Sequence, residues 1–395
     1  MNDSLMPNMK KTLSRSCWLF AILLFSALTS AASDNSAKGK YLLFVGTYTG
    51  KGSQGIYSFR YDAKSGELTA TGLAAETENP SFLAIDKKGE FVYAVNETGK
   101  YKGAVTGAVR AFRLDRHTGK LTLVNEVASG GADPCYLSFD KTGKFLLVAN
   151  YTGGTVAAFP IFPDGGLGEA SSVLLDKGAL GPNRERQEGP HAHWIEASGD
   201  NHSAYVADLG LDRVLSYRLD ASTGKLAPEK DAAVGVPGSG PRHAVISDNG
   251  NRLYVLGEVD SSVTVFERRE GKRFEQVQHL SALPAGFSSP NDAAEIAMHP
   301  SGKYLYTSNR GHNSIALFAV DAKTGKLELV EDSPTLGKIP RHFEIDPTGT
   351  RLFVANEESG NIVVFRIDAK TGKLTPTGQT LQVASPVCLK FVRAE

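Results

Sequence analysis

The chain has 395 residues, of which 41% are hydrophobic, and its 43 Lys and Arg residues balance its 43 Asp and Glu residues. This balance excludes the basic field that a nucleic-acid backbone requires, and the acidic composition of a disordered tail, so a small or neutral partner fits better. The apolar content is sufficient for a large core, and 41 Gly and 18 Pro residues indicate frequent turns.

Residues 1–32 have the pattern of a secretory signal peptide. Lys10, Lys11 and Arg15 precede the apolar run CWLFAILLFSAL, and SAA then supplies the small residues of a cleavage site. The run is short for a membrane span, although an uncleaved anchor is the alternative. We therefore expect an exported, periplasmic protein that has no membrane attachment after cleavage and begins with a short linker at residues 33–39.

Only two cysteines, Cys135 and Cys388, remain after such a cleavage. They lie far apart in the sequence, and a disulfide framework in a small secreted domain has many closely spaced cysteines. The core, and not a set of disulfides, is therefore expected to hold the mature protein together.

One pattern recurs along the rest of the chain. Each copy has a Pro with a short apolar strand, a D/N/S-x-x-G turn, a second strand ending in an Asn-like residue, a third strand ending in F-x-x-D, and a TGKL turn into a fourth strand. Six complete copies start at Pro80, Pro134, Pro190, Pro241, Asp292 and Pro340. The segment from Tyr41 supplies strands two to four of another copy, and residues 386–392 supply its missing first strand, which gives seven.

The strands alternate apolar and polar residues between Gly-containing turns, so each copy is predicted to be a four-stranded antiparallel sheet. Stacking the sheets radially covers their faces, and a ring closed by one strand from each terminus removes the exposed edges. The sequence therefore predicts an all-β fold, a seven-bladed β-propeller that occupies residues 40–395 as one domain. An open solenoid is the alternative, and the split first copy argues against it.

The first strand of a propeller blade lines the central channel. Antiparallel pairing brings the start of this strand and the end of the second strand to the same channel mouth. In GPHAHW, His191 and His193 lie two residues apart, and simple alternation places them on one wall of the channel. Ionisable side chains concentrate in blades four to seven, and the candidate site residues are His191, His193, Asp208, Arg242, His243, Glu258, Glu295, Arg310, Arg341 and His342. Such groups around one concave opening are costly to desolvate without a ligand.

Each candidate also has a structural explanation. Asp208 can pair with Arg213, and Arg242 can pair with Glu258 without any ligand. His193 can be a buried histidine that bonds to a backbone group. The histidines of the two PRH motifs occupy matching positions, which a structural hydrogen bond explains at least as well as chemistry does.

The ordered set of motifs GTYTG, NPSFLAID, GPHAHW, ADLGLDRV, GPRHAV, SNRGH and PRHFEIDPTG resembles the seven-bladed lactonase family, which includes propeller-type 6-phosphogluconolactonases and fungal carboxymuconate cyclases. The resemblance covers the mature chain and implies lactone chemistry without a metal or cofactor. It places the catalytic set on the histidine of GPHAH, either His191 or His193, and on Arg242, Glu258 and Arg310. The export signal departs from the resemblance, because phosphogluconolactone is a cytosolic metabolite.

Lactone hydrolysis needs a base for water and positive groups for the developing oxyanion. We expect a histidine to be the base, Arg242 and Arg310 to hold the oxyanion and any anionic group, and Glu258 to orient the histidine or to protonate the departing alkoxide. The expected substrate-binding residues are Asp208, His243, Glu295, Arg341 and His342.

Three other functions compete with lactone hydrolysis. A calcium site could use oxygens of Asp208, Glu258, Glu295 and Asn309, but nearby arginines repel a cation. A muconate-type cyclase would run the chemistry in the lactonising direction. A non-catalytic ligand- or protein-binding propeller would show a large apolar patch on its outer face, and the sequence contains no sign of one.

Overall fold

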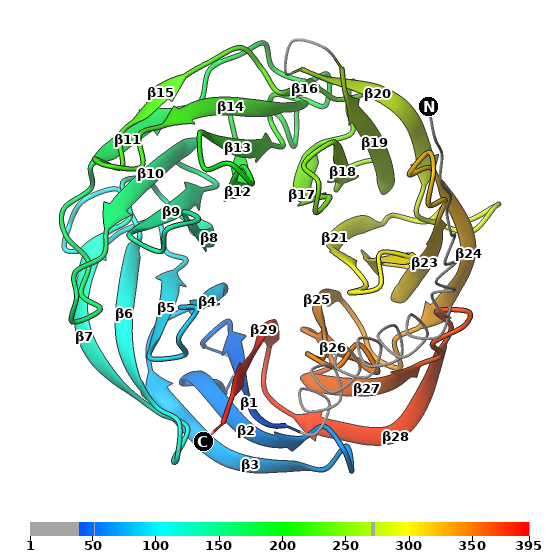
Figure 1. Ribbon diagram of the computed structural model, residues 1–395, viewed down its shortest axis with the longest axis horizontal. Coiled ribbons are helices and arrows are strands. Elements are labelled where there is room, and N and C mark those ends of the chain that lie inside the picture. The colour runs from blue at the N-terminus through cyan, green and yellow to red at the C-terminus, as the bar shows by residue number, and fades with distance from the viewer. Residues whose placement is uncertain (1–38, 51, 270–272, 395) are drawn as a thin grey trace, which may run out of the picture.

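The computed structural model describes residues 39–50, 52–269 and 273–394. Within these residues the strands assemble into seven antiparallel sheets arranged around a central axis (Figure 1). No helix in the described part is long and apolar enough to cross a membrane. The predicted signal peptide lies outside the described residues.

The sheets are numbered as blades in the order of the sequence copies. Blade 1 consists of β29 (Pro386–Arg393), β1 (Lys40–Thr47), β2 (Gly55–Asp62) and β3 (Leu68–Glu76). Blade 2 consists of β4 (Leu83–Ile85), β5 (Phe91–Asn96), β6 (Ala108–Asp115) and β7 (Lys120–Ala128). Blade 3 consists of β8 (Pro134–Phe139), β9 (Phe145–Asn150), β10 (Thr155–Pro160) and β11 (Ser172–Leu175). Blade 4 consists of β12 (Ala192–Ala197), β13 (Ser203–Asp208), β14 (Arg213–Leu219) and β15 (Leu226–Pro228), with β16 (Ala233–Val234) also paired to β14.

The remaining blades repeat the same order. Blade 5 consists of β17 (Pro241–Ile246), β18 (Arg252–Gly257), β19 (Ser262–Arg268) and β20 (Phe274–Ser281). Blade 6 consists of β21 (Asp292–Met298), β22 (Tyr304–Arg310), β23 (Ser314–Val320) and β24 (Leu327–Pro334). Blade 7 consists of β25 (Pro340–Ile345), β26 (Arg351–Asn356), β27 (Asn361–Ile367) and β28 (Leu374–Gln382).

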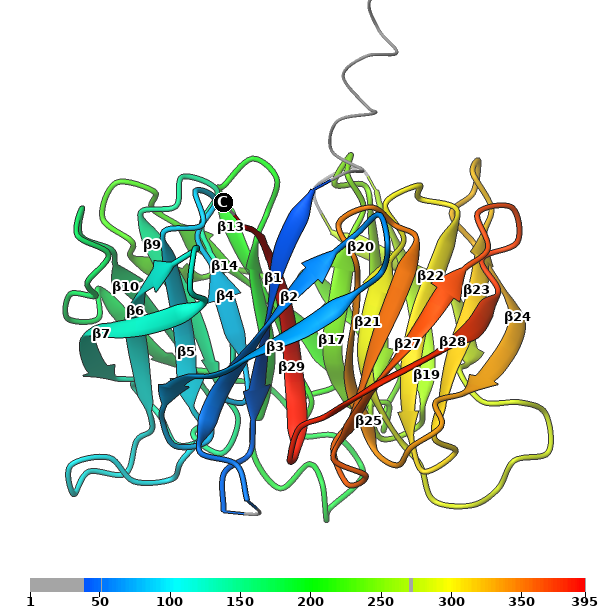
Figure 2. The ribbon, with the colours of Figure 1, turned by 90° about the horizontal axis from the view of Figure 1, so that it is seen from below.

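Blade 1 contains both ends of the described chain. β29 runs antiparallel to β1, with Leu389 opposite Val45 and Phe391 opposite Leu43, and Figure 2 shows the two strands side by side. The split first copy and the all-β seven-bladed propeller predicted from the sequence are therefore confirmed.

The recurring D-x-x-G turns are held by aspartate side chains. Oδ1 of Asp86 accepts hydrogen bonds from the backbone N–H groups of Glu90 and Phe91, both at 2.7 Å. Asp140 and Asp346 make the same pair of bonds at the equivalent turns of their blades. The carboxylate satisfies backbone donors that the turn leaves without a strand partner, which explains why this residue type recurs.

The hydrophobic core lies between neighbouring blades. Tyr61 of blade 1 packs edge-on against Phe353 of blade 7, with ring centroids 5.3 Å apart, in a buried cluster that also contains Leu389 of the closing strand. Second strands such as β9 are buried along their whole length, because each sheet is covered on both faces by its neighbours.

The first strands of the seven blades lie innermost (Figure 1). Their N-terminal ends meet the C-terminal ends of the second strands at one face of the ring, which we call the mouth. In Figure 2 the mouth is the lower face, where β1 ends, and the C-terminus lies at the opposite face.

Candidate active site

In the described blades other than blade 2, the register between the first two strands shifts near the mouth, which leaves an extra residue on the first strand. In blade 5, Pro241 pairs with Gly257 and His243 pairs with the adjacent Leu256, so Arg242 is an extra residue without a partner. Cys135 in blade 3 and Arg341 in blade 7 occupy the same bulged position. An extra residue in one strand locally redirects its side chain, and here it does so toward the channel opening.

Blade 4 corrects one prediction from the sequence. β12 begins at Ala192, which pairs with Asp208, and the register shifts before Trp194 pairs with Ala207. His193 is therefore the bulged residue equivalent to Arg242, whereas His191 precedes the strand. The expected alternation of the two histidines along one wall is wrong, because the bulge interrupts the two-residue period.

Both histidines nevertheless contact the ring of Tyr151. His191 stacks on this ring with centroids 4.4 Å apart and an interplanar angle of 13°. The imidazole of His193 meets the same ring edge-on at 5.4 Å. Tyr151, which follows β9, is a site residue that the sequence did not single out.

The carboxylate of Glu258 is the centre of an ionic cluster at the mouth. Nε of Arg242 lies 2.7 Å from Oε2 of Glu258, and Nη2 of Arg310 lies 3.0 Å from the same oxygen. Arg186 pairs with the other carboxylate oxygen and also with Asp292, the latter at 2.9 Å. Among the described residues, three guanidinium groups thus converge on one buried carboxylate.

These arginines decide the charge of Glu258. Burial alone would raise the pKa of this carboxyl, but Arg310, Arg242 and Arg186 outweigh burial and lower the pKa to about 2. An ionised carboxylate saturated by arginines has no proton to donate near neutral pH. The expectation that Glu258 protonates an alkoxide or orients a histidine therefore does not fit the geometry, and its contacts assign it to holding the arginines.

Arg186 was missed by the sequence analysis. It lies on the connection from β11 to β12, where GPNRERQEGP has no counterpart in the repeated pattern. Long insertions in otherwise short loops often carry function, so the extra length of this segment was the available signal.

The two histidines of GPHAHW differ in the state of their ring nitrogens. For His191, Nδ1 lies 3.1 Å from the carbonyl oxygen of Tyr151 and Nε2 lies 3.1 Å from Oε1 of Glu188, so both nitrogens face acceptors. For His193, Nδ1 lies 3.6 Å from Sγ of Cys135. Its Nε2 bonds to no described residue and does not belong to the fully enclosed unpaired polar atoms, so this nitrogen keeps an accessible lone pair or N–H group.

His193 is held in its neutral form. Burial lowers its pKa well below the ordinary value, and the nearby positive charges of Arg242 and Arg341 and the imidazole of His243 act in the same direction. The same interactions place this imidazole in the field of both bulged arginines.

The guanidinium of Arg341 has hydrogen-bond donors at the mouth that bond to no described residue. It lies over the ring of Tyr48, 5.2 Å from the centroid, and it makes no hydrogen bond or ion pair with the described residues. The hydroxyl of Tyr48 donates to the carboxylate of Glu97 at 2.9 Å, which fixes the ring beneath the arginine.

His243, Glu295 and His342 lie one step deeper in the channel. Nδ1 of His243 is 3.1 Å from Oε1 of Glu295, and Nε2 of His342 is 3.4 Å from Oε2. Burial lowers the pKa of His243 to about 4 and that of His342 to about 3, even though Glu295 opposes the shift. The carboxylate thus bridges two neutral imidazoles, which is the structural explanation that the repeated PRH motif allowed.

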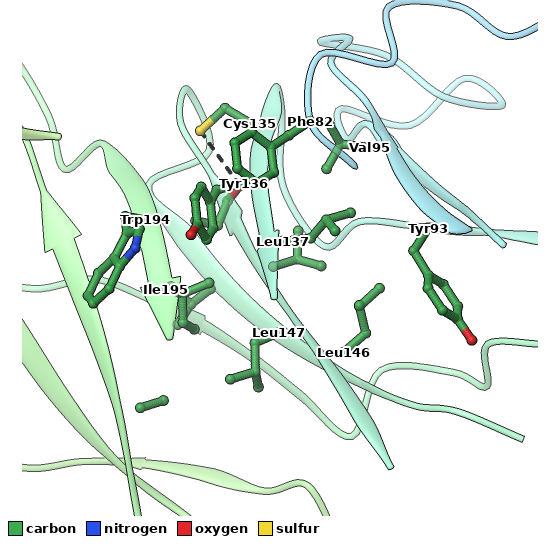
Figure 3. Close-up of a cluster of buried hydrophobic side chains, with 14 of the residues drawn as sticks. Phe82, Tyr93, Val95, Cys135, Tyr136, Leu137, Leu146, Leu147, Trp194 and Ile195 are labelled. Atoms are coloured by element: carbon green, nitrogen blue, oxygen red, sulfur yellow. Dashed lines mark hydrogen bonds between the residues drawn. The ribbon is translucent and has the colours of Figure 1, made fainter. Parts of the chain in front are cut away.

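This bridge plugs the channel together with Phe82 and Tyr136, whose ring centroids are 4.2 Å apart (Figure 3). The space between this plug and the bulged residues Cys135, Arg242 and Arg341 is only ≈ 10 Å³, about enough for one water molecule. A second cavity of ≈ 300 Å³ opens on its far side, lined by Trp194, Glu196 and Lys390 among others. A substrate at the mouth is therefore separated from the opposite face of the ring.

Asp208 does not reach the mouth. Its side chain is completely buried, and Oδ1 accepts hydrogen bonds from the backbone N–H groups of His191 at 2.9 Å and Leu211 at 3.0 Å. Arg213, the partner considered from the sequence, pairs with Asp231 instead. Asp208 therefore supports the backbone of the GPHAH segment.

No group of three or more His, Cys, Asp or Glu side chains in the described ranges could hold a metal ion. A groove of ≈ 740 Å³ runs between blades 2 and 3 and is lined by turn residues such as Lys88 and Lys141. We place the candidate site at the mouth. Buried ionisable groups converge there, and some of their hydrogen-bond donors and acceptors have no partner among the described residues.

Residues 42–391 match the family model described as "Lactonase, 7-bladed beta-propeller". The chain belongs to this lactonase family. It is 37% identical to a 6-phosphogluconolactonase of Bacillus subtilis over 89% of the present chain and 99% of that protein. A 6-phosphogluconolactonase of Formosa agariphila is 35% identical over 77% of this chain and 86% of its own length. The solved structure of the periplasmic gluconolactonase PpgL from Pseudomonas aeruginosa superposes with a TM-score of 0.84 at 33% identity, covering 90% of the lactonase and 100% of PpgL.

We expect Glu258→Gln to destabilise the lactonase by about 3–5 kcal/mol at pH 7, because it leaves buried arginines without their counter-charge. The folded-state pKa of Glu258, about 2, lies below the ordinary value of 4.5, so the stabilisation is complete above pH 4.5 and is lost as the pH falls toward 2. Urea unfolding of both proteins between pH 7 and pH 3 should show a difference that shrinks in acid.

Glu275→Gln is the matched control, because this carboxylate is 62% exposed, and it should change the stability by less than about 0.5 kcal/mol. A difference for Glu258→Gln that grows as the pH falls would contradict the assignment.

Proposed function

We propose that this lactonase hydrolyses a sugar lactone of the 6-phosphogluconolactone type at the mouth, without a metal or cofactor. The observation that carries the proposal is the imidazole of His193, whose Nε2 bonds to no described residue and which lies in the field of Arg242 and Arg341. The names of the relatives, a 6-phosphogluconolactonase and a periplasmic gluconolactonase, support the same substrate class.

His193 is the proposed base. A general base needs a free lone pair within reach of water, and its pKa must lie below the working pH. His193 meets both conditions, whereas both ring nitrogens of His191 already face acceptors. Nε2 of His193 takes a proton from water as the water oxygen bonds to the lactone carbonyl carbon.

Arg242 is the proposed oxyanion donor. Its Nε is committed to Glu258 and its Nη1 to the carbonyl oxygen of Ala294, while Nη2 bonds to none of the described residues. Burial lowers the pKa of this guanidinium to about 10, with Glu258 opposing the shift, so it remains charged near neutral pH. A fixed positive donor in a water-poor site stabilises the charge that develops on the carbonyl oxygen.

The tetrahedral intermediate then breaks the bond between the carbonyl carbon and the ring oxygen. The imidazolium of His193 returns its proton to the departing alkoxide, which leaves the sugar as a hydroxy acid that ionises in solution. Arg310, which bonds to Glu258 and to the carbonyl oxygens of Asp292 and Ala293, holds Glu258 in place and thereby orients Arg242.

The purified mature chain should release acid from a panel of sugar lactones, followed by pH-stat titration. We expect Arg242→Ala to lower kcat/KM by about 10²- to 10³-fold, as loss of one oxyanion donor usually does, and His193→Gln to lower it at least as much. The acid limb of kcat/KM should lie below the pKa of a free histidine, because burial keeps His193 unprotonated.

His191→Gln is the matched control and should retain more than a tenth of the activity. Treatment with EDTA should leave the rate unchanged. A loss below tenfold for both Arg242→Ala and His193→Gln, on a lactone that the wild type opens, would contradict the assignment of both residues.

Arg341 is proposed to bind the anionic group of the substrate, because its guanidinium forms no ion pair with the described residues, although the charges of Glu97, Glu357 and Glu258 act on it. We expect Arg341→Gln to raise KM for the phosphorylated lactone by about 10- to 100-fold, in the range of a hydrogen bond to a charged group. KM for the unphosphorylated lactone should change by less than about threefold. Arg366→Gln, an exposed arginine of β27, is the control, and equal effects of Arg341→Gln on both lactones would overturn the assignment.

We also propose that the lactonase acts in the periplasm, because residues 10–32 have the pattern of a cleavable export signal. Cell fractionation should then find the mature chain, beginning near residue 33, in the periplasmic fraction. Recovery of the uncleaved chain from the cytosol or the membrane would contradict this location.

A further inference from the structure

Cys135 and His193 occupy the bulged positions of adjacent blades. Sγ of Cys135 lies 3.6 Å from Nδ1 of His193, and the two residues belong to β8 and to β12. The sulfur is also 3.6 Å from the carbonyl oxygen of Ala192 and 3.9 Å from that of Ala149. A buried thiol thus stands between backbone acceptors and the Nδ1 nitrogen of the imidazole.

The thiol keeps its proton. Burial raises the pKa of Cys135 far above its ordinary value, and Glu97 adds to the shift while Arg242 and Arg341 oppose it. A thiolate–imidazolium pair is therefore excluded at neutral pH, and the sulfur has one hydrogen to donate and lone pairs to accept with.

The thiol of Cys135 can take part in two hydrogen bonds at once in only one tautomer of His193. If Nδ1 carries the proton, it donates to the sulfur and the S–H group donates to the carbonyl oxygen of Ala192. If Nε2 carries the proton instead, the S–H group can serve either Nδ1 or the carbonyl oxygen, but not both. A neutral imidazole has one donor and one acceptor nitrogen, and the partner of one nitrogen fixes the state of the other.

We propose that Cys135 is a positioning residue that holds His193 as the Nδ1–H tautomer, so that the lone pair of Nε2 faces the mouth. This inference rests on the proposed function, in which His193 is the base. Without the sulfur, Nδ1 loses its acceptor and the proton is free to move to Nε2, where it blocks the uptake of a proton from water.

The tautomer can be measured without any turnover. The chain contains nine histidines, and ¹⁵N-labelling of their imidazoles, with His193→Gln to assign the signal, distinguishes Nδ1–H from Nε2–H in long-range ¹⁵N–¹H spectra at pH 7.5. We expect the wild type to show Nδ1–H at His193, and Cys135→Ala to move the population toward Nε2–H. An Nε2–H signal in the wild type, or an unchanged signal in Cys135→Ala, overturns the proposal even if the protein is an active lactonase.

Kinetics provide the second measurement. Cys135→Ala should lower kcat on a sugar lactone by about three- to tenfold with KM within twofold, because one hydrogen bond of ordinary strength is lost. Cys135→Ser, whose hydroxyl can accept from Nδ1 and donate to the carbonyl, should recover most of the rate. An unchanged kcat in Cys135→Ala, or a Cys135→Ser variant as slow as Cys135→Ala, contradicts the positioning.

Cys388→Ala is the matched control for loss of a buried thiol. Cys388 is also buried on a first strand, and its sulfur accepts from the backbone N–H of Leu83 at 3.4 Å instead of facing a histidine. It should change the thermal stability as much as Cys135→Ala does, while leaving kcat and the His193 signal as in the wild type. A fall in kcat for Cys388→Ala as large as that for Cys135→Ala would show that packing alone is responsible and would overturn the proposal.

Discussion

The extra residue at the start of the first strand, found in every described blade except blade 2, is the constraint on which the mouth depends. A regular strand sends neighbouring side chains to opposite faces of its sheet, and in a propeller both faces are covered by adjacent blades. The bulge releases one residue from this alternation, so that Cys135, His193, Arg242 and Arg341 turn toward the opening. These four side chains of the candidate site therefore occupy one repeated position of the fold.

The ionic groups at this position fall into two kinds. Arg242 is held by Glu258, which is itself enclosed by Arg186 and Arg310, so its geometry is set before a ligand arrives. Such preorganisation is what stabilises a developing charge without reorganisation during the reaction. Arg341 has no such partner in the described chain and stands over an aromatic ring, which suits a group that must exchange water for a ligand.

The deeper ring has a different physical character. Glu295 bridges two imidazoles whose pKa values are depressed by burial, and aromatic rings fill the space beside them. Polar groups that contact one another in this way add rigidity to a channel that is otherwise a hole through the fold. The structure separates the ring of ionic groups at the mouth from a deeper ring that fills the channel, although both contain histidine and glutamate.

The fold was predictable from the sequence because every blade repeats the same turn residues and strand pattern. The split first copy was also predictable, since an open edge at both ends of the array would be costly. The membership of Arg242, Glu258 and Arg310 in one cluster followed from the antiparallel pairing of first and second strands.

Other parts of the site were beyond a pattern-based prediction. The choice between His191 and His193 depended on where β12 begins, and the Pro that marks the other first strands lies two residues too early in GPHAHW. Arg186 belongs to an insertion, so no repeat predicts its place. Asp208 and the PRH histidines have the residue types of a site, but Asp208 bonds to a backbone segment and the two histidines contact Glu295, which only contacts in three dimensions reveal.

The pairing of β29 with β1 also determines when the ring can close during folding. The strand that completes blade 1 follows the strands of the other six blades in the chain, so the first blade stays open until those blades have been synthesised. Contacts between such distant segments form slowly, because the loop entropy must be overcome before they can stabilise anything. The nascent chain therefore remains without a closed circle, and without a complete mouth, until β29 has been made.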